Sequence, residues 1–314
     1  MSQVPVRVAV EPAGVRDWLR EAVREAGAEI TAPEHAEALV WTAAGPEVGA
    51  DGPRQLQRLL AQHPHLAWVQ LPWAGVEEYA AAGVFDHDRW WTCGKGVYAD
   101  PVAEHALALA LAGLRELARF SRAQSWGDQA GISLMGGAAT IFGGGGIARS
   151  LIDLLQPFGC HLTVVRRSDA PLEGVDRVLP FEQRYEALRG ADVVFLALAL
   201  TPETEQLIGE VELELMEPHA WLVNVGRGSH VVTSDLVAAL RGDVIGGAAL
   251  DVTDPEPLPD NHPLWDLPNC LITPHTANTE DMAKPLLGGR ITENLRRYAA
   301  GEPLLGVVDP DAGY

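Results

Sequence analysis

Short runs of apolar residues alternate with segments of helical character, and this alternation limits the fold of the chain more than any other feature. In the second half the apolar runs are Ala139–Phe142, Leu162–Val165, Val193–Ala197, Leu222–Val225, Gly247–Leu250 and Leu271–Thr273. The helical segments between them are Ile147–Leu155, Arg184–Leu188, Gly209–Met216 and Ser234–Arg241. Alternation of this kind builds a parallel sheet with helices on both faces. The second half is therefore predicted to form a doubly wound α/β sheet.

The first hundred residues show the same alternation in a shorter form. Strands are predicted at Val6–Val10, Leu39–Thr42 and Ala67–Leu71, and helices at Val15–Ala26 and Gln55–Gln62. A segment rich in alanine and leucine, Val102–Arg122, follows Asp100-Pro101 and is predicted to be one long helix. Because it is apolar on most faces, we expect it to be buried between layers. Thr279–Ala300 is predicted to be a last helix that leads back to the first domain.

Composition and charge narrow the classes of function. A length of 314 residues suggests about two domains. The hydrophobic fraction of 47% is enough for a large core. The formal net charge of −20 disfavours binding to nucleic acid or to an anionic membrane surface. The apolar run near the N-terminus, Met1–Val10, is too short for a signal sequence or a membrane span. Cys93, Cys160 and Cys270 have no disulfide or metal-ligand spacing, so a cytoplasmic protein without a metal is expected.

A glycine-rich turn joins the first strand of the second half to the helix after it. The residues 141–148 read I-F-G-G-G-G-I-A, a G-x-G-x-x-A pattern. Gly143 permits a tight turn, Gly145 lets the backbone approach a pyrophosphate, and Ala148 allows close helix packing. Gly146 and Ile147 begin a helix whose N–H groups favour phosphate. The turn predicts a dinucleotide site, although a glycine-rich turn alone is weak evidence.

The next strand ends in basic residues where an acid is common. Sites selective for NAD usually carry an acid about 20 residues after the glycines, to bind the ribose 2′-hydroxyl. Here Arg166, Arg167 and Ser168 occupy that place. Because arginine pairs well with a 2′-phosphate, NADP(H) is the predicted cofactor and NAD(H) the second candidate. The alternative is two solvated arginines at a strand end.

Three later segments place polar side chains after predicted strands. Arg227 lies between two glycines, Asp251 ends a strand, Glu256 sits in a proline-rich loop, and His275 follows Thr-Pro. The carboxyl ends of parallel strands line the ligand crevice of a doubly wound sheet, so we expect these groups to converge there. Taken singly, each could be a structural residue.

These motifs, in this order, resemble the D-isomer-specific 2-hydroxyacid dehydrogenase family over nearly the whole chain. The resemblance rests on the glycine turn, N-V-G-R-G at 224–228, L-D-V-T-D-P-E-P-L-P at 250–259 and T-P-H-T-A at 273–277. L-T-P-E-T at 200–204 and V-A-E-H at 102–105 are also similar to family signatures. The segments A-L-V-W at 38–41 and W-A-G-V at 73–76 are most similar to the glyoxylate/hydroxypyruvate reductases.

The resemblance implies a catalytic set and two binding sets. Arg227 would bind the carboxylate and polarise the carbonyl of a 2-keto acid, and His275 would be the acid/base, held by Glu256. Asp251 would anchor the nicotinamide. Further cofactor residues would be Leu198, Thr204 and Val225, and the substrate residues would be Trp41, Ala74, Gly75 and Val76.

The family also implies an architecture of two Rossmann-like parallel-sheet domains with a cleft between them. A smaller, flavodoxin-like substrate domain would comprise residues 1–97 and 285–314, and residues 98–284 would form the dinucleotide-binding domain. A homodimer is expected, with the segment Val102–Arg122 near the contact.

Several alternatives stay open at this point. The substrate could be phenylpyruvate, D-lactate or phosphoglycerate, although the segment at Trp41-Thr42 lacks the arginine that would hold a phosphate. A formate dehydrogenase would have glutamine in place of Glu256. Thr253 and Asn278 depart from the common aromatic and glycine of the family, which bears on the substrate. A cofactor-sensing protein of the corepressor type would need extra tails. His105 is expected to pack within its helix, and His230 has no assigned role.

Overall fold

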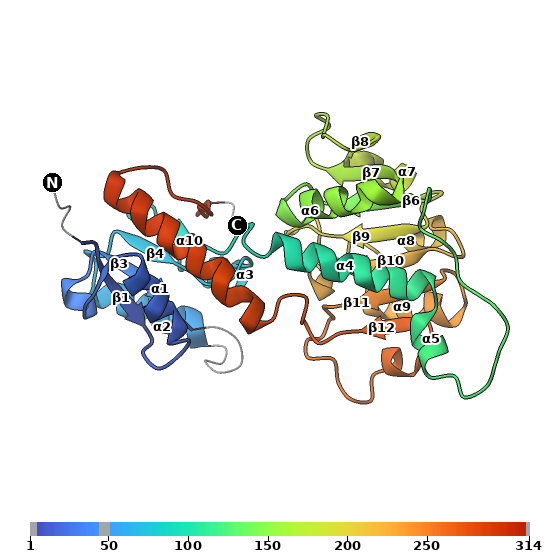
Figure 1. Cartoon of the computed structure of the whole chain (residues 1–314), viewed down its shortest axis with the longest axis horizontal. Coiled ribbons are helices and arrows are strands. Elements are labelled where there is room, and N and C mark those ends of the chain that lie inside the picture. The colour runs from blue at the N-terminus through green and yellow to red at the C-terminus, as the bar shows by residue number, and fades with distance from the viewer. Residues whose placement is uncertain (1–4, 44–50, 312–314) are drawn as a thin grey trace. The chain divides into compact units, whose positions relative to one another are not determined.

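The computed structural model describes residues 5–43 and 51–311, and the chain divides into two compact units (Figure 1). Unit 1 comprises Met1–Tyr98 and Thr279–Tyr314, and unit 2 comprises Ala99–Asn278. The N-terminal residues 1–4 of the apolar run considered above lie outside the described residues. Within the described ranges, every helix is too short or too polar to cross a bilayer.

Unit 1 is a five-stranded parallel sheet in the order β2-β1-β3-β4-β5, with helices on both faces. This is the flavodoxin-like order. Leu19 of α1 and Ile291 of α10 pack on one face of the sheet, and Leu56 of α2 and Tyr79 of α3 on the other. In chain order the elements are β1 (Arg7–Glu11), α1 (Trp18–Glu25), β2 (Glu29–Ile30), η1 (Pro33–His35), β3 (Ala38–Trp41), α2 (Gly52–Gln62), β4 (Trp68–Gln70), α3 (Glu77–Ala81), β5 (Trp90–Thr92) and α10 (Glu280–Ala300).

Unit 2 is a seven-stranded parallel sheet in the order β12-β11-β10-β9-β6-β7-β8. Six of these strands have the doubly wound Rossmann order, with β12 added at one edge. Its first elements are α4 (Ala99–Leu114), α5 (Leu117–Ser121), β6 (Ala138–Phe142), α6 (Gly146–Leu155), η4 (Gln156–Phe158), β7 (His161–Arg166), β8 (Arg177–Pro180), η5 (Phe181–Gln183) and α7 (Arg184–Leu188). The others are β9 (Val193–Leu196), α8 (Glu210–Leu215), β10 (Trp221–Asn224), η6 (Gly228–His230), α9 (Thr233–Arg241), β11 (Gly247–Leu250), η7 (Pro263–Asp266) and β12 (Cys270–Ile272).

Alternate residues of each central strand in unit 2 face two separate cores. Phe142, Leu196 and Leu222 pack with α7, α8 and α9, whereas Ile141 and Phe195 pack with α4 and α6. Strands buried on both faces are mostly apolar, which is why their positions could be predicted from short apolar runs. The predicted α/β fold class is confirmed.

The long helix predicted at Val102–Arg122 is interrupted. It begins earlier, at Ala99, and is divided at Glu116, which has a left-handed φ of 50°. The amide N–H of Ile132 donates to the carbonyl oxygen of Leu114 at 2.8 Å, so the returning chain takes an acceptor at the end of α4. The prediction of one continuous helix was wrong because a distant segment competes for that end.

Unit 2 ends at Asn278, before the second crossing predicted between residues 284 and 285. Thr279 caps α10, because its hydroxyl oxygen accepts a hydrogen bond from the N–H of Met282. The helix thus starts at the crossing itself and packs along α1.

Candidate active site

All predicted catalytic and cofactor residues lie in unit 2, at the carboxyl ends of strands of one parallel sheet or in the segments that follow them. The segments that carry them follow β6, β7, β9, β10, β11 and β12. Because parallel strands end at the same edge of a sheet, residues distant in sequence are collected along one edge.

The turn between β6 and α6 has the geometry of a phosphate-binding loop. Gly143 has a φ of +124°, and a Cβ there would lie 2.2 Å from the carbonyl oxygen of Ala197, so only glycine fits. Gly145 is the N-cap of α6, and its N-terminus has no side-chain cap. A Cβ at Gly145 would meet nothing within 4 Å, so the backbone is open to a ligand. The unpaired N–H groups of the first turn of α6 suit an anion.

Arg166, the last residue of β7, lies against this turn. Its Cδ would be 2.8 Å from a Cβ on Gly144, and its Nη2 donates to the carbonyl oxygen of Ala170 at 2.5 Å. Its Nε is buried and has no hydrogen-bond partner among the described residues. Arg167 and Ser168 are exposed beside it. A guanidinium beside a phosphate-binding loop, followed by a second, exposed arginine, suits a second phosphate group.

The other predicted cofactor residues differ in exposure. Val225 is buried at the end of β10, and Leu198 is half-buried after β9. Thr204 stabilises the turn that follows Leu198. Its hydroxyl donates to the carbonyl oxygen of Ala199 at 2.8 Å and accepts from the N–H of Thr201 at 2.8 Å.

Arg227 is presented by a turn that its neighbours hold rigidly. The Asn224 amide donates to the carbonyl oxygen of Arg227 at 2.8 Å and accepts from the N–H of Gly226 at 3.0 Å. A Cβ on Gly228 would lie 2.0 Å from the carbonyl oxygen of Thr253, so the turn packs directly on the loop that leads to Glu256.

Glu256 and His275 are in direct contact. Glu256 Oε1 lies 2.7 Å from His275 Nδ1, and both side chains are about half exposed. The hydrogen bond with Glu256 raises the pKa of His275, against the opposing effect of burial. Burial acts to raise the pKa of Glu256, but the hydrogen bond from His275 and the nearby charge of Arg227 outweigh it and lower that pKa. The pair therefore favours imidazolium and carboxylate together, with Nε2 left for other contacts.

Asp251 is buried beneath His275 and holds its backbone. Its carboxylate accepts hydrogen bonds from the hydroxyl of Thr273 at 2.6 Å and from the N–H groups of Thr276 at 2.9 Å and Ala277 at 3.1 Å. His275 itself has a left-handed φ of 48°, a conformation that costs about 1–3 kcal/mol outside glycine. Burial opposes ionisation, yet these bonds and His105 lower the pKa of Asp251 to about 2. The carboxylate thus stabilises the strained loop, a contact that sequence reasoning did not anticipate.

His105, which was expected to pack within its helix, also contacts this network. Its Nε2 lies 3.1 Å from the hydroxyl oxygen of Thr273 and 3.4 Å from Asp251 Oδ1. The motif V-A-E-H at 102–105 drew attention to His105, but its contact with Thr273 and Asp251 could not be predicted without the position of α4.

The predicted substrate residues lie in unit 1. Ala74, Gly75 and Val76 follow β4, and Ala74 is exposed. Trp41 is only 2% exposed, and its indole N–H donates to the hydroxyl of Tyr79 at 3.0 Å. Its burial favours core packing over a direct substrate contact. Trp73 lies on the same tyrosine, with ring centroids 5.5 Å apart.

Comparisons with known proteins agree with these features. Residues 105–277 match the family model described as D-isomer specific 2-hydroxyacid dehydrogenase, NAD binding domain. An uncharacterized protein from the proB 3′ region of Corynebacterium melassecola is 40% identical over 80% of this chain and 84% of its own. A glyoxylate reductase of Aeropyrum pernix is 33% identical over 78% of this chain and 76% of its own.

A solved structure resembles the whole chain. It is a D-isomer specific 2-hydroxyacid dehydrogenase from Xanthobacter autotrophicus Py2 in complex with NADPH and MES. The match has a TM-score of 0.84 at 28% identity and covers 99% of this chain and 100% of the other. The resemblance inferred from the motifs is confirmed.

Proposed function

Because the chain belongs to the D-isomer specific 2-hydroxyacid dehydrogenase family, we propose that it uses NADPH to reduce a small 2-keto acid to the D-2-hydroxy acid. Glyoxylate or hydroxypyruvate is the favoured substrate, since relatives with these activities are similar in sequence. The observation that carries the proposal is the 2.7 Å contact between His275 and Glu256, at the sheet edge that also holds the glycine turn.

Each residue of the catalytic set has a separate task. The bound cofactor supplies the hydride. Arg227 binds the carboxylate of the keto acid and stabilises the negative charge that develops on the carbonyl oxygen. His275 donates the proton to that oxygen from Nε2, because Glu256 occupies Nδ1. The backbone N–H groups of the segment Ala74–Val76 are proposed to bind the substrate carboxylate.

A substrate panel tests this function. Purified protein is mixed with NADPH or NADH and with glyoxylate, hydroxypyruvate, pyruvate, phenylpyruvate or 3-phosphohydroxypyruvate, and the loss of absorbance at the reduced nicotinamide band is followed. The highest kcat/KM is expected for glyoxylate or hydroxypyruvate with NADPH. Absence of turnover with every keto acid would reject the enzymatic proposal, and a preference for another acid would reject only the substrate.

The NADPH preference predicts a selective loss when Arg166 and Arg167 are both replaced with alanine. The double variant lacks the two positive charges proposed to face the 2′-phosphate, so the KM for NADPH is expected to rise about 10- to 100-fold, while the KM for NADH changes less than threefold. Steady-state kinetics with each cofactor at saturating keto acid measure the ratio. Equal losses for both cofactors would contradict an arginine–phosphate contact. Arg177→Ala, at an exposed position on β8, is the matched control.

Replacing Glu256 with glutamine should move the pH profile. In the native protein the hydrogen bond to Glu256 raises the pKa of His275, so the imidazolium that reduction needs persists to higher pH. Glutamine removes that charge, and the alkaline limb of kcat/KM for reduction is expected to shift to lower pH. For oxidation, which needs neutral His275, the acid limb should shift in the same direction. If the pH profiles of the Glu256→Gln variant match those of the native protein for both reduction and oxidation, Glu256 does not set the pKa of His275.

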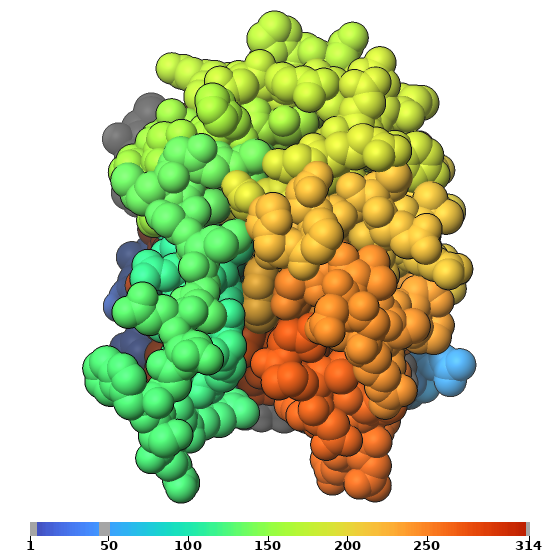
Figure 2. Space-filling model, turned by 90° about the vertical axis from the view of Figure 1, so that its right-hand side faces the viewer, coloured from blue at the N-terminus to red at the C-terminus, as the bar shows by residue number. Residues whose placement is uncertain are grey.

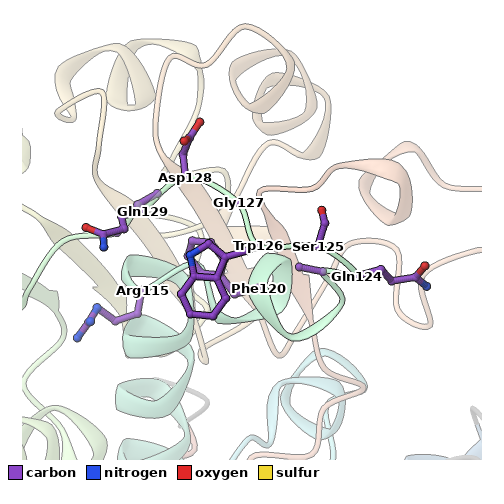
Figure 3. Close-up of a pocket in the computed structure, with 11 residues that line it drawn as sticks. Arg115, Phe120, Gln124, Ser125, Trp126, Gly127, Asp128 and Gln129 are labelled. Atoms are coloured by element: carbon purple, nitrogen blue, oxygen red, sulfur yellow. The ribbon is translucent and has the colours of Figure 1, made fainter.

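A homodimer is the proposed assembly, and an exposed arm supports it. The arm comprises residues 115–131 and includes α5; residues 121–133 are all exposed. In Figure 2 it forms a green ridge on one face of unit 2. Its apolar side chains are open to solvent, with Leu117 52% and Trp126 102% exposed. Arg115, Phe120 and Trp126 are among the residues that line a hollow of about 890 Å³. Figure 3 shows their side chains. Apolar patches of this kind mark association sites.

Changing Leu117 and Trp126 together to serine is expected to convert the dimer to a monomer. Light scattering after size exclusion, at micromolar concentration, measures the mass. Because both side chains lie on the surface, the monomer should remain folded, with a thermal midpoint below that of the dimeric control Tyr185→Ser only by the stability that association contributes. A native protein that is already monomeric would reject the assembly.

The three cysteines are free, as suits the reducing cytoplasm proposed as the location of the protein.

A further inference from the structure

His230 is a buried titratable side chain that the proposed mechanism does not use. It ends η6, three residues after Arg227, and its exposure is 0%. Its Nδ1 lies 2.9 Å from the carbonyl oxygen of Thr204, and its Nε2 lies 3.2 Å from the carbonyl oxygen of Leu198. Carbonyl oxygens only accept hydrogen bonds, so the ring acts toward both as a donor: the neutral form from one nitrogen, the imidazolium from both.

The two carbonyls belong to one loop, which we call the β9 loop (residues 198–206). It contains Leu198 and Thr204, which are proposed cofactor contacts, and most of its residues are exposed or half-exposed. Where the loop ends, the backbone is paired: the N–H of Gln206 donates to the carbonyl oxygen of Ser229 at 2.7 Å, and that of Ile208 donates to the carbonyl oxygen of His230 at 2.9 Å. The imidazole adds contacts to the first residue of the loop, Leu198, and to Thr204 near its other end.

The same ring touches the turn that carries Arg227. A Cβ on Gly226 would lie 3.0 Å from Cδ2 and 3.2 Å from Nε2 of His230, and 3.2 Å from the carbonyl oxygen of Leu198. One side chain therefore lies against both the β9 loop and the backbone directly before Arg227. The neighbouring residues Ile208 and Val231 have apolar side chains, and their backbone N–H groups already donate to His230 and Gly228, so neither replaces the ring as a donor.

We propose that His230 is a positioning residue, which fixes the β9 loop against the Arg227 turn so that the loop is ordered before the cofactor binds. This inference rests on the proposed use of NADPH. Exposed loops with few core contacts open at low free-energy cost. If the loop is already ordered in the free protein, cofactor binding does not bear the conformational-entropy cost of ordering it. Loss of the ring would remove its hydrogen bonding to the β9 loop, which predicts weaker cofactor binding by ~10- to 100-fold.

Three variants test the proposal. His230→Phe keeps an aromatic ring but removes the ring nitrogens, and His230→Gln keeps an amide donor. Val231→Ala removes buried volume from the adjacent residue without touching the hydrogen bonds. For each protein without cofactor, hydrogen exchange of residues 198–206 is measured by mass spectrometry. The Kd for NADPH is measured by fluorescence, the thermal midpoint by calorimetry, and kcat at saturating NADPH by absorbance.

The expected pattern separates positioning from general stability. His230→Phe should speed exchange in the β9 loop and raise the Kd for NADPH at least tenfold, with kcat at saturation within about threefold of native. His230→Gln should recover part of both losses, and Val231→Ala should lower the thermal midpoint without changing either. Should His230→Phe fail to fold, the glutamine variant compared with Val231→Ala carries the same test.

Two results would overturn the inference. One is loop exchange and a Kd for NADPH in both His230 variants that match the native protein. The other is a Val231→Ala protein that loses as much thermal midpoint as the His230 variants and shows equal changes in loop exchange and in the Kd for NADPH. If the native protein binds no NADPH, the proposed function fails instead, and the exchange measurement still reports whether His230 orders the loop.

Discussion

Replacing His275 with alanine is expected to lower kcat for NADPH-dependent reduction of glyoxylate by about 10²- to 10⁴-fold. The reason is that His275 is the group proposed to deliver a proton as negative charge forms on the substrate oxygen. Its imidazole is held by Glu256 at 2.7 Å, and that hydrogen bond raises its pKa, so the acid form persists to higher pH than in a free histidine. Initial rates at saturating cofactor and keto acid measure the loss.

The alanine variant must be shown to be folded and able to bind cofactor. The Kd for NADPH should stay within about threefold of native, because the glycine turn and Arg166 belong to other loops. His262→Ala, in a loop outside the catalytic set, serves as the control for removal of a histidine from the same unit. A His275→Ala protein with native kcat would show that the proton comes from elsewhere.

The second large effect is expected at Arg227. Changing it to glutamine should lower kcat/KM for the keto acid by about 10²- to 10³-fold, since a donor aimed at developing charge contributes on that scale. Arg227→Lys retains the charge but loses the forked geometry, so it should recover only part of the activity. Steady-state kinetics at saturating NADPH give kcat and KM separately, and both are expected to worsen.

The control for this prediction is Arg241→Gln, at an exposed position in the last turn of α9. It removes a guanidinium from the same unit far from the sheet edge, and native kinetics are expected. Should Arg227→Gln raise KM without lowering kcat, the guanidinium would serve only in substrate binding, and its proposed part in stabilising the transition state would be wrong.

The secondary structure that sequence reasoning missed lies mainly at the edges. β2 and β8 are the outer strands of their sheets, and β5 is the other edge of unit 1. Edge strands are covered less completely, so they need no continuous apolar run, and Arg177–Pro180 in β8 begins with arginine and ends with proline. The central strands, buried on both faces, were identified because they are nearly continuous apolar runs.

Side-chain roles divided in a similar way. The order of the motifs was enough to collect Arg227, Glu256 and His275 in one prediction, but it could not distinguish a buried tryptophan from a pocket wall. Trp41 is buried because α3 places Tyr79 over it. Asp251 is enclosed by the loop that carries His275, and that loop bends back only in the folded chain.

From the amino-acid sequence alone came the alternation of strands and helices, the phosphate-binding turn and the family, because these depend on local periodicity and on short motifs. The motifs also predicted that Glu256 would hold His275, and the tertiary structure supplied the 2.7 Å contact; it alone decided that Asp251 supports a strained backbone and that His230 faces two carbonyls of one loop. Those contacts join residues from separate loops, and only the closing of the parallel sheet brings the ends of its strands together.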